Sequence, residues 1–302
     1  MVVAVLGAGA LGTLVAAALA AECEVRLLVR ESRVERAIAG RGGVNVAGEA
    51  IRAVHVTRDP EASRGAALLI VAVKTYATVD ALVPFRAVLP HDAVVLSLQN
   101  GIDAAAHIAR ALGGHARIAL GPTTEAAIWL EPGLVRRTAI GATHVGWAEG
   151  HVSGQEPGAV AALLTRCGLR AAVARPIEPY AWAKLVVNAA INPVTALARV
   201  SNGAILDDAA LRARAAALAR EAFAVAEAAG IALPFPDPVA EAERVMSLTS
   251  ANRSSMLQDL ERGGPTEIEA ISGAIVRRAA TYGLHVPQTK RAYDDVLARA
   301  GA

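Results

Sequence analysis

Short apolar runs alternate with longer segments of helical character through the first half of the chain. Residues 2–6 are β-prone, residues 11–21 are rich in alanine and leucine without proline, and residues 24–30 return to a strand pattern. Two further runs, 67–73 and 94–98, are almost wholly apolar, as strands buried on both faces of a sheet are. The alternation predicts an α/β fold with a doubly wound parallel sheet of Rossmann type.

The pattern changes near residues 175–179 (RPIEP), where two prolines bracket a stretch that cannot continue a regular element. We therefore predict two domains, residues 1–174 with the parallel sheet and residues 175–302 with an all-α fold. Helical segments are expected at 181–190, 207–229, 238–248, 267–282 and 288–300. Two finer expectations are that Pro193 ends or kinks its helix and that residues 44–57 form a small hairpin.

Composition narrows the classes of partner. The 30 basic and 28 acidic residues give a net charge of +2, which is too balanced to attract nucleic acid or a membrane surface through a general field. Cys23 and Cys167 have neither a disulfide framework nor metal-ligand spacing, and the seven histidines are scattered. The apolar start of the chain lacks the basic residues of a signal peptide and is interrupted by glycines. We expect a cytoplasmic protein without a metal.

A glycine motif follows the first predicted strand and opens the first predicted helix. Its glycines serve a tight turn, close approach of a pyrophosphate and tight packing of helix on strand, while backbone N–H groups at the helix start bind phosphate. The pattern in this context predicts a dinucleotide site formed by Gly7, Ala8, Gly9, Ala10, Leu11 and Gly12.

The end of the second predicted strand indicates which dinucleotide binds. NAD-selective proteins place an acidic residue there for the ribose hydroxyls, whereas this chain has Arg30, a permanent cation suited to a 2′-phosphate. NADPH/NADP+ is therefore the expected cofactor, with Arg33 as a possible second contact. Glu31 leaves room for the other interpretation, in which Arg30 is a solvated surface residue.

A lysine and two asparagines share one face of the first helix in the second half. Lys184, Asn188 and Asn192 are spaced four residues apart among apolar neighbours. Only three of the 30 basic residues are lysines, and a desolvated lysine, unlike arginine, can act as a general acid. The same spacing also fits an amphipathic helix with one wet stripe.

Seven runs together resemble the ketopantoate reductase family across both domains. They are GAGALG (7–12), VKTYAT (73–78), QNG (99–101), AWAKLVVNAAINPVTAL (181–197), SNG (201–203), NRSSMLQDL (252–260) and PTEIE (265–269). The resemblance implies NADPH-dependent reduction of 2-dehydropantoate to pantoate, in pantothenate and coenzyme A biosynthesis. It also implies a helical domain of the 6-phosphogluconate dehydrogenase C-terminal-like type.

The resemblance further implies roles for individual residues. Lys184 would be the proton donor to the substrate carbonyl, and Glu267 the family's essential glutamate, near the lysine and the cofactor. Besides the glycine motif, the implied cofactor contacts are Arg30, Lys74, Asn100, Ala127 and Glu267. The implied substrate contacts are Asn100, Lys184, Asn188, Asn192, Asn202, Asn252, Ser254 and Ser255.

Other interpretations remain open from the sequence. Asn100 with Gly101 is also a common turn, Ser254 with Ser255 a common helix cap, and Glu267 an acid favoured at a helix start. The protein is expected to be a monomer or homodimer acting on a small 2-keto acid. The competing functions are reduction of another branched 2-keto acid and, in a different class, non-catalytic NADP(H) sensing.

Overall fold

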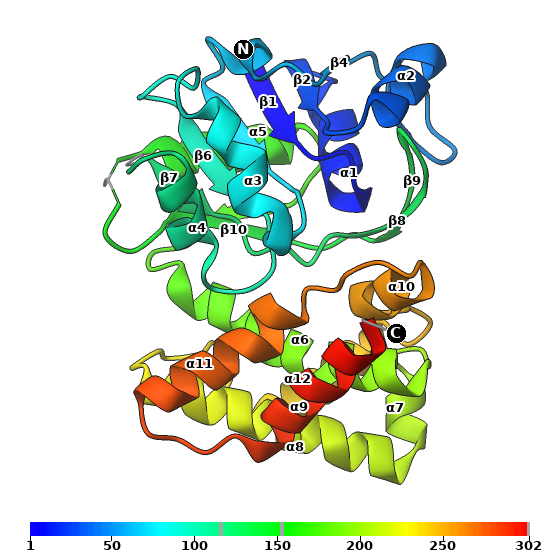
Figure 1. Cartoon of the computed structure of the whole chain (residues 1–302), viewed down its shortest axis with the longest axis vertical. Helices are drawn as coiled ribbons and strands as arrows, with labels where there is room; N and C mark the ends of the chain where they lie inside the picture. The colour runs from blue at the N-terminus through cyan, green and yellow to red at the C-terminus, as the bar shows by residue number, and fades with distance from the viewer. Residues whose placement is uncertain (115–116, 152–153, 301–302) are drawn as a thin grey trace. The chain divides into compact units, whose positions relative to one another are not determined.

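The computed structural model describes residues 1–114, 117–151 and 154–300, and the chain divides into two compact units (Figure 1). The Rossmann unit comprises Met1–Gln99 and Ala104–Ile177. The helical unit comprises Glu178–Ala302 together with the short segment Asn100–Asp103. The division after Ile177 lies close to the boundary predicted after residue 174, but no pattern indicated that Asn100–Asp103 belongs with the helices.

An eight-stranded sheet forms the centre of the Rossmann unit, in the order β11-β10-β7-β6-β5-β1-β2-β4. All neighbouring strands pair in parallel except β7 and β10, which are antiparallel. The predicted parallel sheet is confirmed. Its strands are β1 (Val2–Leu6), β2 (Glu24–Leu28), β4 (His55–Thr57), β5 (Leu68–Val71), β6 (Val94–Ser97), β7 (Ile118–Leu120), β10 (Thr143–Trp147) and β11 (Ala171–Val173).

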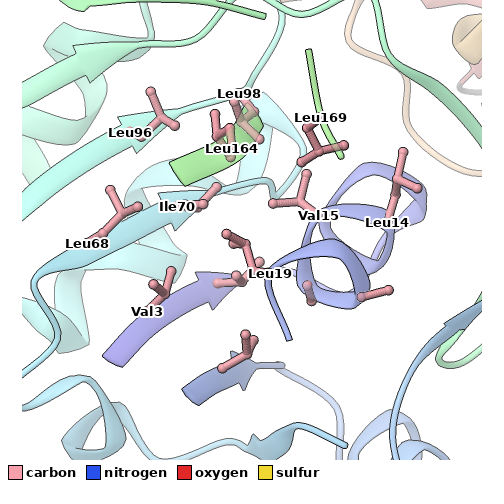
Figure 2. Packing of buried hydrophobic residues seen from close by; sticks show 14 of the residues in the cluster. Val3, Leu14, Val15, Leu19, Leu68, Ile70, Leu96, Leu98, Leu164 and Leu169 are labelled. Carbon is pink, nitrogen blue, oxygen red and sulfur yellow. The ribbon is translucent and has the colours of Figure 1, made fainter. Parts of the chain in front are cut away.

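Helices cover both faces of this sheet, which explains why its central strands are apolar throughout. One face packs against α1 (Ala10–Leu19) and α5 (Glu156–Arg166), and Figure 2 shows Val3, Ile70 and Leu96 gathered with side chains of these helices. The opposite face packs against α3 (Thr78–Leu82) and α4 (Ala104–Ala111). The remaining elements near the sheet are α2 (Ser32–Arg41) and the short turns η1 (Pro60–Ser63), η2 (Thr75–Ala77) and η3 (Val83–Phe85).

The predicted hairpin over residues 44–57 is wrong. Its first part, β3 (Asn45–Val46), pairs in parallel with β9 (Leu134–Ala139), which pairs antiparallel with β8 (Ala126–Glu131). Its second part, β4, joins the large sheet beside β2, so that only an isolated bridge from Val44 to Arg52 remains. A two-stranded hairpin buries little surface by itself, and Val44 instead becomes fully buried in the core.

The helical unit is built around its longest helix, α6 (Glu178–Ala198), which contributes to both apolar clusters of this unit. Figure 1 shows the surrounding helices, most of them at the segments that the sequence predicts. They are α7 (Ala204–Asp207), α8 (Ala209–Ala228), α9 (Pro238–Leu248), α10 (Ser255–Glu261), the π-helical turn η4 (Glu269–Gly273), α11 (Ala274–Thr281) and α12 (Pro287–Ala300).

Pro193 does not end α6, which rules out the first of the two expected effects, while a kink at this residue stays a prediction. A proline inside a helix costs about 3 kcal/mol, because it removes one hydrogen bond and crowds the preceding turn. The following turn compensates, since Val194 and Thr195 are buried against neighbouring helices. The helix ends five residues later at Ala198, and Arg199 adopts a positive φ of 60°.

Candidate active site

The glycine motif has the geometry that a bound pyrophosphate requires. Gly7 has φ +108°, and a Cβ on Gly12 would lie 1.9 Å from the Gly7 carbonyl oxygen, so neither position accepts a side chain. Around Gly9, by contrast, a Cβ would meet nothing within 4 Å. Gly9 is also the N-cap of α1 and contributes no side-chain cap, which leaves the helix N–H groups available to an anion. The motif therefore fits a dinucleotide.

Basic groups dominate the surface at the end of β2. The Arg30 side chain is 89% exposed, and its guanidinium lies 3.9 Å from the Glu31 carboxylate. That carboxylate accepts a hydrogen bond of 2.5 Å from Arg33, so its charge is already engaged. Arg58, which follows the neighbouring strand β4, donates to the Arg30 carbonyl at 3.2 Å. The sequence analysis did not identify Arg58. Parallel pairing of β2 and β4 places Arg58 beside Arg30 at the carboxyl ends of these two strands.

The turn that carries Lys74 is held by a buried glutamine. Lys74 is the N-cap of η2, directly after β5 and Val73. The Gln99 amide, at the end of β6, donates to the Val73 carbonyl at 2.8 Å and to the Thr78 hydroxyl at 2.7 Å. Gln99 thus fixes the turn on which Lys74 sits.

The remaining predicted cofactor contact of this unit, Ala127, lies in β8. It is partly buried and packs against the apolar cluster that includes α1. The structure therefore places Ala127 beside the helix that the glycine motif opens. Contact of Lys74 or Ala127 with the cofactor stays a prediction.

Four predicted site residues of the helical unit come together around a carboxylate. The Asn100 side-chain amide donates to Glu267 Oε2 at 2.8 Å. Asn188 Nδ2 lies 3.4 Å from Asn100 Oδ1 and donates to it weakly. Glu267 is only 6% exposed, and its charge acts on Lys184, one turn before Asn188 on α6. Residues from three distant parts of the sequence thus form one cluster, Asn100–Lys184–Asn188–Glu267.

The electrostatics of this cluster favour proton transfer near neutral pH. Burial lowers the pKa of Lys184 to about 8, because an ammonium ion loses hydration among apolar helices, while the Glu267 carboxylate limits that decrease. A lysine with an ordinary pKa near 10.4 would release its proton much less readily. Such a lowered pKa beside a specific charged partner is typical of catalytic sites.

A short segment outside the helices brings Asn100 to the cluster. Ile102 packs against the core of the helical unit, and a Cβ on Gly101 would lie 2.6 Å from the Ala270 carbonyl oxygen. Asp103 accepts hydrogen bonds from Arg277 at 3.2 Å and from Arg278 at 2.9 Å, both on α11. The sequence analysis did not identify the ion pairs of Asp103, because pairs between residues so distant in the sequence leave no local pattern.

The serines predicted to bind substrate occupy different environments. Ser254 is 6% exposed, and its Oγ accepts a hydrogen bond of 3.1 Å from the Leu257 N–H, so it caps α10. Ser255, the first residue of α10, is exposed. The alternative interpretation of a helix cap is therefore confirmed for Ser254, while contact of either serine with substrate stays a prediction.

The three other predicted substrate contacts are Asn192 on α6, Asn202 in the turn after α6, and Asn252 in the loop that precedes α10. Asn192 is 6% exposed on α6, two turns after Lys184. Asn202 donates its side-chain amide to the Thr249 hydroxyl at 2.9 Å and its backbone N–H to the Asn252 carbonyl at the same distance. The Asn202 side-chain oxygen is buried and has no hydrogen-bond partner among the described residues, so it is available as an acceptor.

The described part of the chain has neither a cluster of metal ligands nor a membrane-spanning helix. Within residues 1–114, 117–151 and 154–300, no group of three or more histidine, cysteine, aspartate or glutamate side chains is arranged to hold a metal ion. One of the seven histidines, His115, lies outside these residues. Over the same residues, no helix has both the length and the apolar character of a membrane span.

Comparison with known proteins gives consistent matches. The family model for ketopantoate reductase PanE/ApbA matches residues 3–150, and the model for the C-terminal part of that family matches residues 176–300. A 2-dehydropantoate 2-reductase of Archaeoglobus fulgidus is 39% identical over 290 residues, which cover 93% of this chain and 92% of the relative.

Solved structures agree with these matches. A PanE/ApbA family ketopantoate reductase from Ralstonia eutropha JMP134 has a TM-score of 0.89 and 29% identity, covering 100% of this chain and 99% of its own. A ternary structure of D-mandelate dehydrogenase with NADH and anilino(oxo)acetate has a TM-score of 0.91 and 25% identity at the same coverage. Because the two family models together span most of both units, the chain belongs to the ketopantoate reductase PanE/ApbA family.

Proposed function

We propose that this protein catalyses the NADPH-dependent reduction of 2-dehydropantoate (ketopantoate) to pantoate. The observation that carries the proposal is the Asn100–Lys184–Asn188–Glu267 cluster, in which a lysine of lowered pKa lies under the influence of a buried carboxylate. Relatives that match at least 92% of both chains and share 35% to 39% identity carry the name 2-dehydropantoate 2-reductase. A non-catalytic NADP(H) sensor would not require such a cluster.

The chemistry follows from the charges of the residues. When bound, NADPH supplies a hydride to the carbonyl carbon of the keto acid, and negative charge develops on the carbonyl oxygen. The Lys184 ammonium stabilises that charge more strongly in the transition state than in the ground state and then donates its proton to the oxygen. With a pKa of about 8, Lys184 is mostly protonated at neutral pH and still releases its proton readily.

Glu267 and the asparagines set the state of the lysine. The Glu267 carboxylate favours the ammonium form, which opposes the effect of burial and keeps the proton donor charged. Asn100 donates to one oxygen of that carboxylate and accepts from Asn188, so Asn100 orients the carboxylate and Asn188 in turn holds Asn100. The resemblance assigns binding of the hydroxyl and carboxylate groups of the substrate to Asn188, Asn192 and the exposed Ser255.

The cofactor proposed is NADPH/NADP+ rather than NADH. Support comes from the end of β2, where Arg30 is exposed and Arg58 lies next to its backbone, while Glu31 is engaged by Arg33. An arginine offers a forked cation that suits the 2′-phosphate present only in NADPH. The D-mandelate dehydrogenase structure contains NADH, so members of this fold with either cofactor are to be expected.

A second candidate function is reduction of a different 2-keto acid. It is favoured by the structural similarity to D-mandelate dehydrogenase, whose TM-score of 0.91 is as high as that of the ketopantoate reductase relative at 0.89. Both reactions need the same lysine and hydride donor, and they differ in the group attached to the keto acid. The sequence identity of 39% to a 2-dehydropantoate 2-reductase favours ketopantoate over an aromatic keto acid.

The test is direct. Purified protein is mixed with NADPH or NADH and with ketopantoate or phenylglyoxylate, the keto acid that corresponds to mandelate, and absorbance of the nicotinamide is followed. We expect the highest kcat/KM with NADPH and ketopantoate. Faster turnover of phenylglyoxylate would favour the second candidate, and binding of NADPH without turnover of any keto acid would favour the sensor.

We propose that the protein works in the cytoplasm, a reducing compartment in which NADPH is at hand. The free thiols of Cys23 and Cys167 are consistent with such a compartment. We propose that the protein acts as a monomer or homodimer on its small-molecule substrate, without nucleic acid or membrane.

A further inference from the structure

The loop that precedes α10 is fastened to the turn that follows α6. The Gly203 N–H donates to the Ser250 carbonyl at 3.0 Å, and the Asn202 N–H donates to the Asn252 carbonyl at 2.9 Å. The Asn202 side chain adds a bond to Thr249 at 2.9 Å. These contacts hold the first part of the loop, residues 249–252, but do not reach its end at Ser254.

A buried hydroxyl on α6 holds that end. Thr195 is fully buried, and its Oγ1 lies 2.7 Å from Ser254 Oγ. Thr195 Oγ1 is also 2.9 Å from the Ile191 carbonyl oxygen and 3.0 Å from that of Asn192. A threonine inside a helix ordinarily bonds back to a carbonyl of its own helix. The contact with Ser254, 59 residues away in the sequence, is the additional feature here.

Proton counting shows that the Ser254 hydroxyl depends on the Thr195 hydroxyl. Each hydroxyl brings one proton and accepts through its lone pairs. Ser254 Oγ already accepts from the Leu257 N–H at 3.1 Å, and Thr195 lies next to the carbonyls of α6. The two protons therefore serve one bond between the hydroxyls and one bond to an α6 carbonyl. Removal of the Thr195 hydroxyl therefore leaves the Ser254 hydroxyl without its buried partner, which is unfavourable, whereas Thr195 keeps its α6 carbonyls if the Ser254 hydroxyl is removed.

We propose that Thr195 is a positioning residue for the keto acid. It joins α6, which carries Lys184, to the first turn of α10, which presents the exposed Ser255. The link fixes the position of Ser255 relative to the lysine, so that a carboxylate and a carbonyl of one small substrate are held at the correct separation. This inference rests on the proposed function, because it assigns Ser255 to a keto acid that Lys184 protonates.

The variant Thr195→Val removes the hydroxyl with little change in volume. Loss of one buried neutral hydrogen bond corresponds to a factor of roughly three to ten, and we expect the KM for ketopantoate to rise by about that factor. We expect kcat to change less and the Kd of NADPH to stay unchanged, since the glycine motif lies in the Rossmann unit. Thr195→Ser keeps the hydroxyl and should restore the KM.

A matched control separates positioning from general destabilisation. Thr281 on α11 bonds to the carbonyl of Arg277 in its own helix at 3.2 Å, so Thr281→Val removes only an intrahelical bond. We expect Thr281→Val to leave the KM unchanged. Because Thr195 and Ser254 share one bond, adding Thr195→Val to Ser254→Ala should raise the KM much less than it does alone.

Hydrogen exchange, measured without substrate, tests the link independently of activity. We expect the amides of residues 254–261 to exchange faster in Thr195→Val than in wild type, Thr195→Ser or Thr281→Val. An unchanged KM or unchanged exchange in Thr195→Val would overturn the proposal. If wild type reduces no 2-keto acid, the proposed function has failed, and unchanged exchange would then separately overturn the hydroxyl link, whereas faster exchange would support it.

Discussion

The glycine motif of the Rossmann unit and the lysine cluster of the helical unit are each proposed to serve the reaction, yet they are built in opposite ways. The glycine motif occupies six consecutive residues, and its function depends on backbone shape and open space, as at Gly9. The lysine cluster draws on residues 100, 184, 188 and 267, and its function depends on burial and charge. A glycine motif is thus encoded by consecutive residues, whereas the lowered pKa of Lys184 requires the assembled fold that buries it.

The lysine cluster should show the largest effect on substitution. Lys184→Ala removes the proton donor, and loss of general acid catalysis lowers kcat by roughly 10² to 10⁴. The Kd of NADPH should stay nearly constant, because the glycine motif is untouched. Steady-state kinetics and cofactor titration measure the two effects. Lys290→Ala is the matched control, since Lys290 pairs with Asp294 on the surface of α12. Equal turnover by Lys184→Ala and wild type would contradict the assignment.

Glu267→Gln should have the next largest effect, because the amide keeps the size of the side chain but removes its charge. The pKa of Lys184 should then decrease below about 8, since only the lowering effect of burial remains. Loss of an interaction with a charged group corresponds to a decrease of roughly tenfold to a hundredfold in kcat. The pH dependence of kcat provides the signature, which should shift to lower pH. Glu269→Gln, a more exposed neighbour bonded to Tyr293, should show no such shift.

Substitution of Arg30 tests cofactor choice in the Rossmann unit. Arg30→Ala should weaken NADPH by roughly tenfold to a hundredfold, the value of a charge-assisted contact, while NADH is scarcely affected. Dissociation constants of both cofactors on both proteins give the result. Arg36→Ala, an exposed arginine of α2, controls for net charge. Equal weakening of NADPH and NADH would show that Arg30 does not discriminate between them.

Asp103→Asn should have the smallest effect, because it weakens the anchor of the segment that carries Asn100 without changing the cluster itself. Partly exposed ion pairs typically contribute a few tenths of a kcal/mol each, so the loss of both corresponds to a decrease of about two- to fivefold in kcat/KM. High salt should narrow the difference from wild type, because it screens the pairs with Arg277 and Arg278. A loss as large as that of Glu267→Gln would show that Asp103 does more than anchor this segment.

The sequence predicted the local features well. Apolar runs indicated the parallel sheet because its strands are buried on both faces, and the spacing of Lys184 and Asn188 placed them correctly on one helix. Local rules failed where packing outweighed them. Helix α6 continues through Pro193, and the segment predicted as a hairpin is divided between two sheets.

Partners far apart in the sequence were beyond prediction from spacing alone. The Asn100 contact with Glu267, the anchor at Asp103 and the bond between Thr195 and Ser254 each join segments that only the folded chain brings together. The resemblance to a family supplied Asn100 and Glu267 as site residues, but it did not supply the contacts that orient them. In the proposed mechanism, the Asn100 contact orients the Glu267 carboxylate, which favours the charged form of Lys184.

The central claim is that Lys184 donates its proton with a pKa of about 8. The most direct measurement is the pH dependence of kcat/KM for ketopantoate reduction and for pantoate oxidation. Reduction needs the ammonium form, so its rate should be constant at neutral pH and fall as the pH rises through about 8. Oxidation needs the neutral amine, so its rate should rise over the same interval. A reduction rate that stays constant to pH values well above 8, or two profiles that change in the same direction, would contradict the account.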